Sequence, residues 1–172
     1  MKGLVRLGQL VLLVLLLASC AAAVPLPDGA NKPIEPGDKI GNFLITKGAE
    51  GEDIVYPWDS DCAKQAGAEE RYSCKSAVGA KVNLSAGIYD ETLTGKLDSI
   101  WAEHTYEISI EGRPVNLKAF GPIDVPHPQV VKMRAWNVVI LTDKPGEISV
   151  HSKGVVHGDP FEDTTTYTFS AP

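Results

Sequence analysis

Basic residues are scarce in this sequence, and their scarcity limits the partners that the protein can bind. The 172 residues include 16 lysines and arginines against 22 aspartates and glutamates, which gives a net charge of −6. Binding to nucleic acid requires a basic face that neutralises phosphates. We therefore expect no nucleic-acid partner, and no adhesion to anionic lipid through charged side chains.

The sequence also lacks the patterns of familiar catalytic sites. It contains no Gly-x-Ser-x-Gly elbow, no Ser-x-x-Lys with its partner motifs and no glycine-rich phosphate loop. Adjacent acids occur at Glu69-Glu70 and Glu162-Asp163. Such neighbours are typical of a solvated surface, because a glycosidase needs carboxyls on facing elements about 5–9 Å apart. We therefore assign no catalytic residue and no cofactor from the sequence.

Long apolar runs are absent after the first twenty residues. That first segment has a basic start with Lys2 and Arg6, followed by an apolar run from Leu10 to Leu17. The run has the length of a signal-peptide core and is too short to span a bilayer, which needs about 20 apolar residues. Residues 1–19 are therefore predicted to be an export signal, and the remaining chain is predicted to have no transmembrane helix.

Residues Leu17-Ala18-Ser19-Cys20 follow this run directly and resemble the lipobox of bacterial lipoproteins. The resemblance implies cleavage before Cys20, attachment of a diacylglycerol to its thiol and acylation of its new amino group. Several acyl chains anchor a protein stably, at about 0.8 kcal/mol per buried methylene. We expect the domain to lie on the extracytoplasmic side of a cell membrane or outer membrane. The alternative is an ordinary signal peptide cut within residues 21–23, which would release a soluble protein without Cys20.

Residues 20–37 are rich in proline, with Pro25, Pro27, Pro33 and Pro36 among them. Proline at this density favours an extended chain of about 3.1 Å per residue. We interpret the segment as a tether that follows the lipidated cysteine. The folded domain is predicted to occupy residues 38–172, which is enough chain for a core of its own.

Cysteine is rare, with three in the whole chain. Lipidation or removal of Cys20 leaves Cys62 and Cys74, and two cysteines in an exported chain predict one disulfide. It would close a loop of about a dozen residues. A zinc half-site or a redox pair is the alternative, but the spacing is not C-x-x-C and no histidine lies beside the cysteines.

Apolar and polar residues mostly alternate after residue 38, which predicts short β-strands. Strands are expected over 40–46, 53–56, 82–85, 130–141 and 165–169, with a hairpin of 105–111 against 115–119 and a turn at 143–146. The alternation stops after Trp136-Asn137, which predicts either a bulge that switches faces or a strand covered on both sides.

Helix is expected to be rare. Asp59 is expected to cap a short helix over residues 62–66, and the proposed disulfide would hold this irregular or helical insertion. Residues 97–101 fit one or two helical turns, although their type is ambiguous. Three prolines predict a loop over residues 121–128.

These elements predict a mainly β fold of two packed antiparallel sheets, because a parallel α/β sheet would need crossover helices that are missing. The C-terminal two thirds resembles immunoglobulin-like or fibronectin type III-like modules of bacterial surface proteins. The resemblance depends on the strand pattern, on Trp136 and on the Pro145-Gly146 turn. The stretches 101–104 and 136–139 are similar to uncharacterised exported bacterial proteins, from which no function follows.

Two small groups of residues are candidates for binding. His151 and His157 could converge with Asp159 across the final hairpin and hold copper or zinc, but their spacing fits no familiar metal pattern, so no metal site is assigned. Tyr56 and Trp58 could stack on sugar rings or contact a partner. Their alternative role is to close one end of the core.

Together these observations favour a membrane-anchored cell-surface lipoprotein that acts as a non-catalytic binding or structural module. Its expected partners are the membrane, through the lipid, and an envelope protein, a polysaccharide or a small solute. The alternatives are an envelope hydrolase that uses a histidine and an acid, and a metal-binding protein that uses His151 and His157.

The lipid anchor is directly testable. Mass spectrometry of the mature protein should show an N-terminal peptide that begins at lipidated Cys20. Cys20→Ser should release the protein from membranes or leave it unprocessed, because no thiol remains to carry the diacylglycerol. A soluble wild-type protein that begins at Val24 would contradict the assignment.

Overall fold

The structure is a computed structural model that describes residues 32–49, 52–57, 61–65, 70–85, 87–89, 96–127 and 130–171. Within these ranges the chain is mainly β, with two short helices. The strands form three sheets of five, six and three members. The prediction of a mainly β domain with little helix is therefore confirmed.

The five-stranded sheet is built largely from the N-terminal half of the chain. Its members in spatial order are β1 (Lys39–Ile40), β2 (Phe43–Thr46), β12 (Val139–Thr142), β6 (Lys81–Asn83) and β3 (Ile54–Val55). β1 and β2 form a hairpin where the sequence predicts one strand over 40–46. The chain reverses at Gly41, whose φ of +59° is favourable for glycine and costly for residues with a Cβ.

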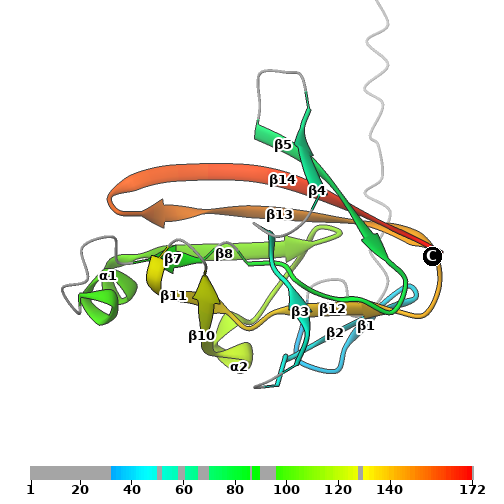
Figure 1. Cartoon of the computed structure of the whole chain (residues 1–172), viewed down its shortest axis with the longest axis horizontal. Helices are drawn as coiled ribbons and strands as arrows, with labels where there is room; N and C mark the ends of the chain where they lie inside the picture. Colours follow the sequence, from blue (N-terminus) through cyan, green and yellow to red (C-terminus); the bar gives the residue numbers. More distant parts are fainter. Residues whose placement is uncertain are drawn as a thin grey trace, which may run out of the picture.

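The six-stranded sheet is dominated by one long hairpin. Its members in spatial order are β4 (Asp61–Lys64), β5 (Glu70–Ala77), β14 (Asp159–Ser170), β13 (Gly146–Val156), β8 (Thr105–Ile110) and β9 (Arg113–Pro114). β13 and β14 pair along their whole length, from Gly146 opposite Phe169 to Val156 opposite Asp159. Figure 1 shows this hairpin running across the molecule, from the C-terminus to the neighbourhood of the first helix.

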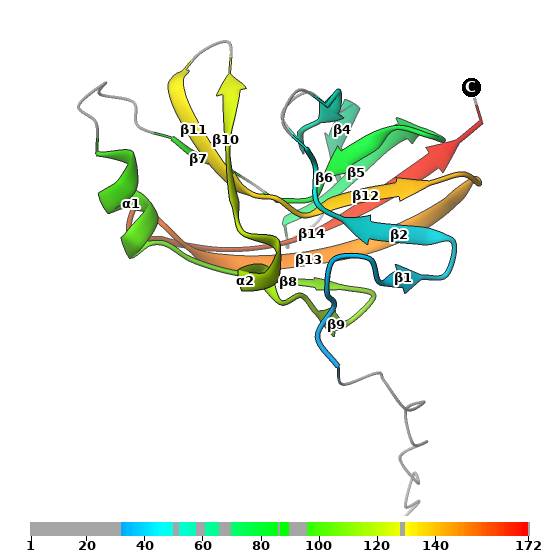
Figure 2. The same ribbon diagram turned by 90° about the horizontal axis from the view of Figure 1, so that it is seen from below.

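The third sheet and the helices lie beside the far half of that hairpin (Figure 2). The sheet has the order β10 (Pro122–His127), β11 (Val130–Trp136) and β7 (Ile88–Tyr89), and the helices are α1 (Leu97–Glu103) and α2 (Leu117–Phe120). Arg134 joins α1 to this sheet, because its guanidinium pairs with Asp98 at 2.7 Å and with Asp124 at 2.5 Å. Among the described residues, no helix has the length and apolar character needed to cross a membrane.

The two larger sheets pack face to face over a single core. Ile45 and Ile140 from the five-stranded sheet share one buried cluster with Ile148 and Val150 from the six-stranded sheet. The rings of Phe43 and Phe169 meet between the sheets at 5.6 Å. Alternate residues of each strand supply this core, as the period of two predicts.

Pairing within the sheets is mixed, where purely antiparallel sheets were expected. β5 runs parallel to β14, and β3 runs parallel to β6. The last strand lies between β5 and β13, although more than eighty residues separate it from β5 along the chain. The alternation of apolar and polar residues indicates which residues share a face of a strand. It does not indicate which strand pairs with it or whether that strand runs parallel or antiparallel.

The sequence pattern predicts a change of environment after Trp136-Asn137, where the alternation of apolar and polar residues stops. In the structure the chain crosses there from one sheet to another. β11 ends at Trp136 in the three-stranded sheet, and β12 begins at Val139 in the five-stranded sheet. The buried Asn137 amide accepts a hydrogen bond from Gly48 N at 2.8 Å and donates one to Gly48 O at 2.9 Å. The side chain of Asn137 therefore replaces a strand partner at the point where the chain leaves one sheet for the other.

Three local predictions are wrong. A helix was expected over residues 62–66, but residues 62–64 belong to β4, which pairs with β5 and has Cys62 directly opposite Cys74, and residue 66 lies outside the described residues. Asp59, the expected helix cap, lies outside the described residues. Residues 115–119 contain α2 in place of a long return strand, and residues 121–128 contain β10 in place of a loop. Pro122 and Pro126 are tolerated because β10 is an edge strand.

Other local predictions are confirmed. The tight turn of the 105–111 hairpin is formed by Glu111 at φ 49° and Gly112 at φ 76°. Residues 97–101, whose type the sequence left ambiguous, belong to helix α1. The predicted turn at 143–146 leads from β12 into β13.

The described fold begins before residue 38. Ile34 is fully buried in the core. Its N–H donates to Pro114 O at 2.8 Å, and its C=O accepts from Asn116 N at 3.0 Å. Residues 34–37, which the sequence assigns to the tether, are therefore attached to the domain.

The Asn137 contacts predict a stability effect. Asn137→Ala should lower the free energy of unfolding by about 1–3 kcal/mol, because it leaves both backbone groups of Gly48 without their partner. Urea denaturation measures this loss. Gln65→Ala, at an exposed position, is the control and should unfold like the wild type. Equal stability of Asn137→Ala and Gln65→Ala would contradict the role assigned to Asn137.

Candidate functional site

A cavity of about 290 Å³ opens on the inner face of the six-stranded sheet, beside the core. Its lining includes Tyr72, Tyr106, Ser152, Asp163, Thr165 and Tyr167, together with Pro57, Leu84 and both disulfide cysteines. We call it the Asp163 pocket. It combines aromatic rings, two hydroxyls and one carboxyl in a space of the size that holds a small molecule.

The strand register explains why these side chains share one face. Thr165 lies opposite Tyr72 of β5, and Tyr167 lies opposite Cys74. Asp163 lies opposite Ser152 of β13. Because successive side chains alternate between faces, residues 163, 165 and 167 all point inward with their opposite partners.

The predicted disulfide forms one wall of the pocket. Cys62 and Cys74 are bonded and directly opposed across β4 and β5, with 4.0 Å between their Cα atoms. Cys62 Sγ lies 3.8 Å from the carbonyl oxygen of Pro57. The disulfide therefore joins the two strands at the place where Pro57 borders the cavity.

Asp163 is the only carboxyl among the described residues that line this pocket. Burial raises the pKa of Asp163 from 3.8 to about 6, the negative charge of Glu70 adds to the increase, and His151 opposes it. Within the described part of the chain, no hydrogen bond or ion pair reaches its side chain. Its neighbour Glu162 points to the other face, where it pairs with His151 at 2.9 Å.

Tyr167 is buried at the base of the pocket, with 2% of its surface exposed. Burial raises the pKa of Tyr167 well above its usual value, and the charges of Tyr106 and Asp163 act in the same direction. The phenol therefore stays protonated at every physiological pH and serves as a neutral hydrogen-bonding group.

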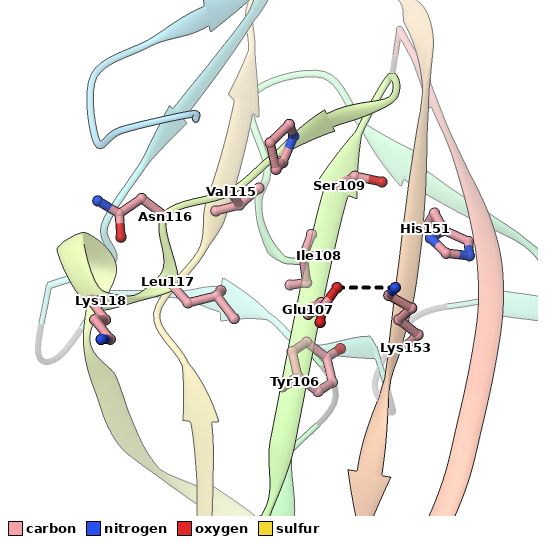
Figure 3. A pocket seen from close by; sticks show the side chains of 11 residues that line it. Tyr106, Glu107, Ile108, Ser109, Val115, Asn116, Leu117, Lys118, His151 and Lys153 are labelled. Carbon is pink, nitrogen blue, oxygen red and sulfur yellow. Dashed lines mark ion pairs between the residues drawn. The ribbon is translucent and has the colours of Figure 1, made fainter. Parts of the chain in front are cut away.

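A second hollow of about 670 Å³ lies along the edge of β8. Figure 3 shows Val115, Asn116 and Leu117 across from Tyr106 and Ile108. Three of the titratable side chains near this edge are paired, whereas the exposed Lys118 forms no ion pair within the described residues. Glu107 bonds Lys153 at 3.1 Å (Figure 3), and His151 bonds Glu162, so these side chains have no unsatisfied charge to offer a ligand.

The predicted aromatic candidates lie beside the Asp163 pocket. Tyr56 is half-buried and directly precedes Pro57, which lines the cavity. Trp58 follows Pro57 but lies outside the described residues, as does the lipidation candidate Cys20. The structure therefore places Tyr56 near the site without placing it in the lining.

The metal candidates do not converge. His151 lies within β13 and pairs with Glu162, whereas His157 forms the turn of the hairpin and contacts the ring of Tyr89 at 6.0 Å. Five strand residues at about 3.3 Å each separate the histidines. In the described ranges, no three histidine, cysteine, aspartate or glutamate side chains cluster in a way that could hold a metal ion.

Asp163 is the functional candidate that the sequence pattern missed. Its position next to Glu162 is typical of a solvated acidic pair, but strand alternation sends one carboxyl outward and the other inward. The sequence does contain an indication of this position, because Asp163 lies on the same strand face as Thr165, Tyr167 and Phe169. A carboxylate on an apolar strand face indicates a specific environment.

Comparisons with protein families, with curated proteins and with solved structures find no match to this chain. The geometry of the site itself therefore indicates what the domain can bind. Of the two hollows, the Asp163 pocket is the one with a half-buried carboxyl that has no partner among the described residues, whereas Lys118 in the other hollow is exposed.

The pKa of Asp163 predicts how stability changes with pH. The folded chain binds the proton of the Asp163 carboxyl more tightly than the unfolded chain does. Ionisation of Asp163 therefore lowers the free energy of unfolding as pH rises from about 4 to about 6. The cost of the ionised form is at most about 3 kcal/mol. Asp163→Asn should therefore be more stable than the wild type at pH 8 and nearly equal to it at pH 4.

Urea denaturation at the two pH values measures this difference, with Glu162→Gln as the control on the opposite face of the same strand. An Asp163→Asn variant that is less stable than the wild type at pH 8 would show that the carboxylate has a stabilising partner.

Proposed function

We propose that this protein is an exported, lipid-anchored cell-envelope protein, and that its β-domain is a non-catalytic module that binds a small solute in the Asp163 pocket. The observation that carries the proposal is the unpaired carboxylate in a cavity lined by tyrosines and hydroxyls. An ionised, half-buried group without a partner costs folding free energy. A bound ligand that pairs with the Asp163 carboxylate would offset this cost.

The composition of the pocket favours binding over hydrolysis. The described lining residues include no histidine and no carboxyl other than Asp163. Ser152 lines the pocket, but the neighbouring His151 points to the opposite face and pairs with Glu162. A serine without a base is a weak nucleophile, and a lone acid does not make a glycosidase pair.

The volume of the pocket favours a small solute among the expected partners. A cavity of about 290 Å³ is at the lower end of ligand-binding sites and holds one small molecule or one terminal group. An envelope protein or a long polysaccharide would need a wider surface.

The lipid anchor and the tether complete this proposal. Cys20 would hold the protein at the membrane, and the proline-rich chain between it and Ile34 would separate the domain from the lipid. An exported location agrees with the disulfide at the pocket wall. The immunoglobulin-like or fibronectin type III-like topology stays part of the proposal. The two facing sheets support it, and the parallel β5–β14 pairing departs from it.

Ligand-observed NMR on the oxidised domain tests the binding function. Small amines, amino acids, sugars and carboxylic acids are offered separately to the wild type, to Thr165→Phe and to Thr166→Phe. Thr165 lines the cavity, whereas Thr166 is the next residue on the same strand and faces away from it. We expect one class to bind the wild type and Thr166→Phe, and to lose at least tenfold in affinity with Thr165→Phe.

Thermal unfolding of both variants checks that they are folded. The absence of any binding class, or a ligand that binds Thr165→Phe as tightly as the wild type, would overturn the proposed function.

A further inference from the structure

We infer that the Asp163 pocket binds a small organic cation, an alkylammonium or quaternary ammonium group, with the Asp163 carboxylate as its counter-charge and the tyrosine rings around its alkyl groups. This inference rests on the proposed function and names the class of ligand. It depends on three properties of the pocket: the charge that is unpaired, the rings that surround it and the lack of a lysine or arginine among its described lining residues.

The first property is the charge balance around Asp163. Glu70, the opposite residue on β5, forms an exposed ion pair with Lys64 of β4 at 3.2 Å, so this lysine is paired with Glu70 and not with Asp163. His151 of β13 is committed to Glu162 on the other face. Asp163 is left with a full negative charge when it ionises, in a partly desolvated site where an opposite charge is attracted strongly.

The second property is the set of aromatic rings. Tyr72, Tyr106 and Tyr167 come from three different strands and all line the cavity. The Lys64 ammonium lies 5.9 Å from the centre of the Tyr72 ring, so a ring of this pocket already contacts a cation within the protein. The ring of Tyr106 packs against the rings of Phe161 and His104, with ring centroids 5.4 Å and 6.5 Å apart. Aromatic rings arranged around the cation are the usual means by which proteins recognise quaternary ammonium groups.

The third property is the lack of cationic side chains in the lining. Among the described residues that line the cavity there is no lysine or arginine, so an anionic ligand would meet Asp163 without a compensating charge from them. A metal ion would find a single carboxylate, which is too few ligands to hold it. The hydroxyls of Ser152 and Thr165 can accept hydrogen bonds from the N–H groups of an amine.

The titration of Asp163 gives this binding a pH dependence. The groups around it are Glu70 and Tyr72 on β5, Tyr167 on its own strand, Tyr106 on β8, and His151 on β13. The pKa of Asp163 is raised to about 6, so the carboxylate is largely ionised at pH 7.5 and about one tenth ionised at pH 5. Cation affinity should fall about tenfold between these two values.

Isothermal titration with choline and with its neutral isostere 3,3-dimethylbutan-1-ol tests the inference. The two probes have the same shape and differ in charge. We expect choline to bind the wild type at least tenfold more tightly than the neutral isostere at pH 7.5, and to lose about tenfold at pH 5.

Asp163→Asn should lose at least tenfold in choline affinity and most of the pH dependence, because it keeps the size of the side chain and removes its charge. Glu162→Gln is the matched control on the same strand and should bind choline like the wild type. Thermal unfolding shows that both variants are folded.

Equal binding of the two probes, or unchanged choline affinity in Asp163→Asn, would overturn the inference. The inference would also be overturned if choline does not bind while a sugar or an acid binds the wild type and loses affinity with Thr165→Phe. That result would leave the proposed function in place. A domain that binds none of the four ligand classes would overturn the proposed function together with the inference.

Discussion

The architecture depends on the buried hydrogen bonds where the chain crosses from β11 to β12. Asn83 is fully buried, and its amide donates to Trp136 O at 3.0 Å. Its oxygen accepts from Ser85 N at 2.8 Å, and the Ser85 hydroxyl accepts from Trp136 N at 2.9 Å. With the two bonds between Asn137 and Gly48, these contacts satisfy backbone groups that no strand can reach at the crossing.

The position of that crossing determines where the core ends. β12 covers the near half of the β13–β14 hairpin, in which Ile148, Val150, Tyr167 and Phe169 are buried. The chain that would cover the far half belongs to β11, which lies in another sheet. Asp163 and Thr165 lie just beyond the covered part and are half-buried. The Asp163 pocket is thus a consequence of one sheet being shorter than the hairpin that it covers (Figure 1).

The disulfide has a structural role that its sequence position alone does not show. Cys62 and Cys74 are neighbours on adjacent strands, so the bond acts across a sheet and not across a loose insertion. It holds β4 beside β5, whose other edge pairs with β14. The wall of the pocket is therefore covalently connected, and Tyr72 and Asp163 keep a fixed relation through the register of β5 and β14.

Much of the local structure was determined by the sequence alone. Alternation predicted most strands and their shared faces, Glu111-Gly112 and Pro145-Gly146 predicted turns, and the cysteine count predicted the disulfide. The parallel partner of β14, the strand β10 and the inward carboxyl of Asp163 were decided only by the tertiary structure. The physical reason is that periodicity separates two faces of a strand but does not say which face meets a second sheet, how far that sheet extends or which distant segment pairs at the edge.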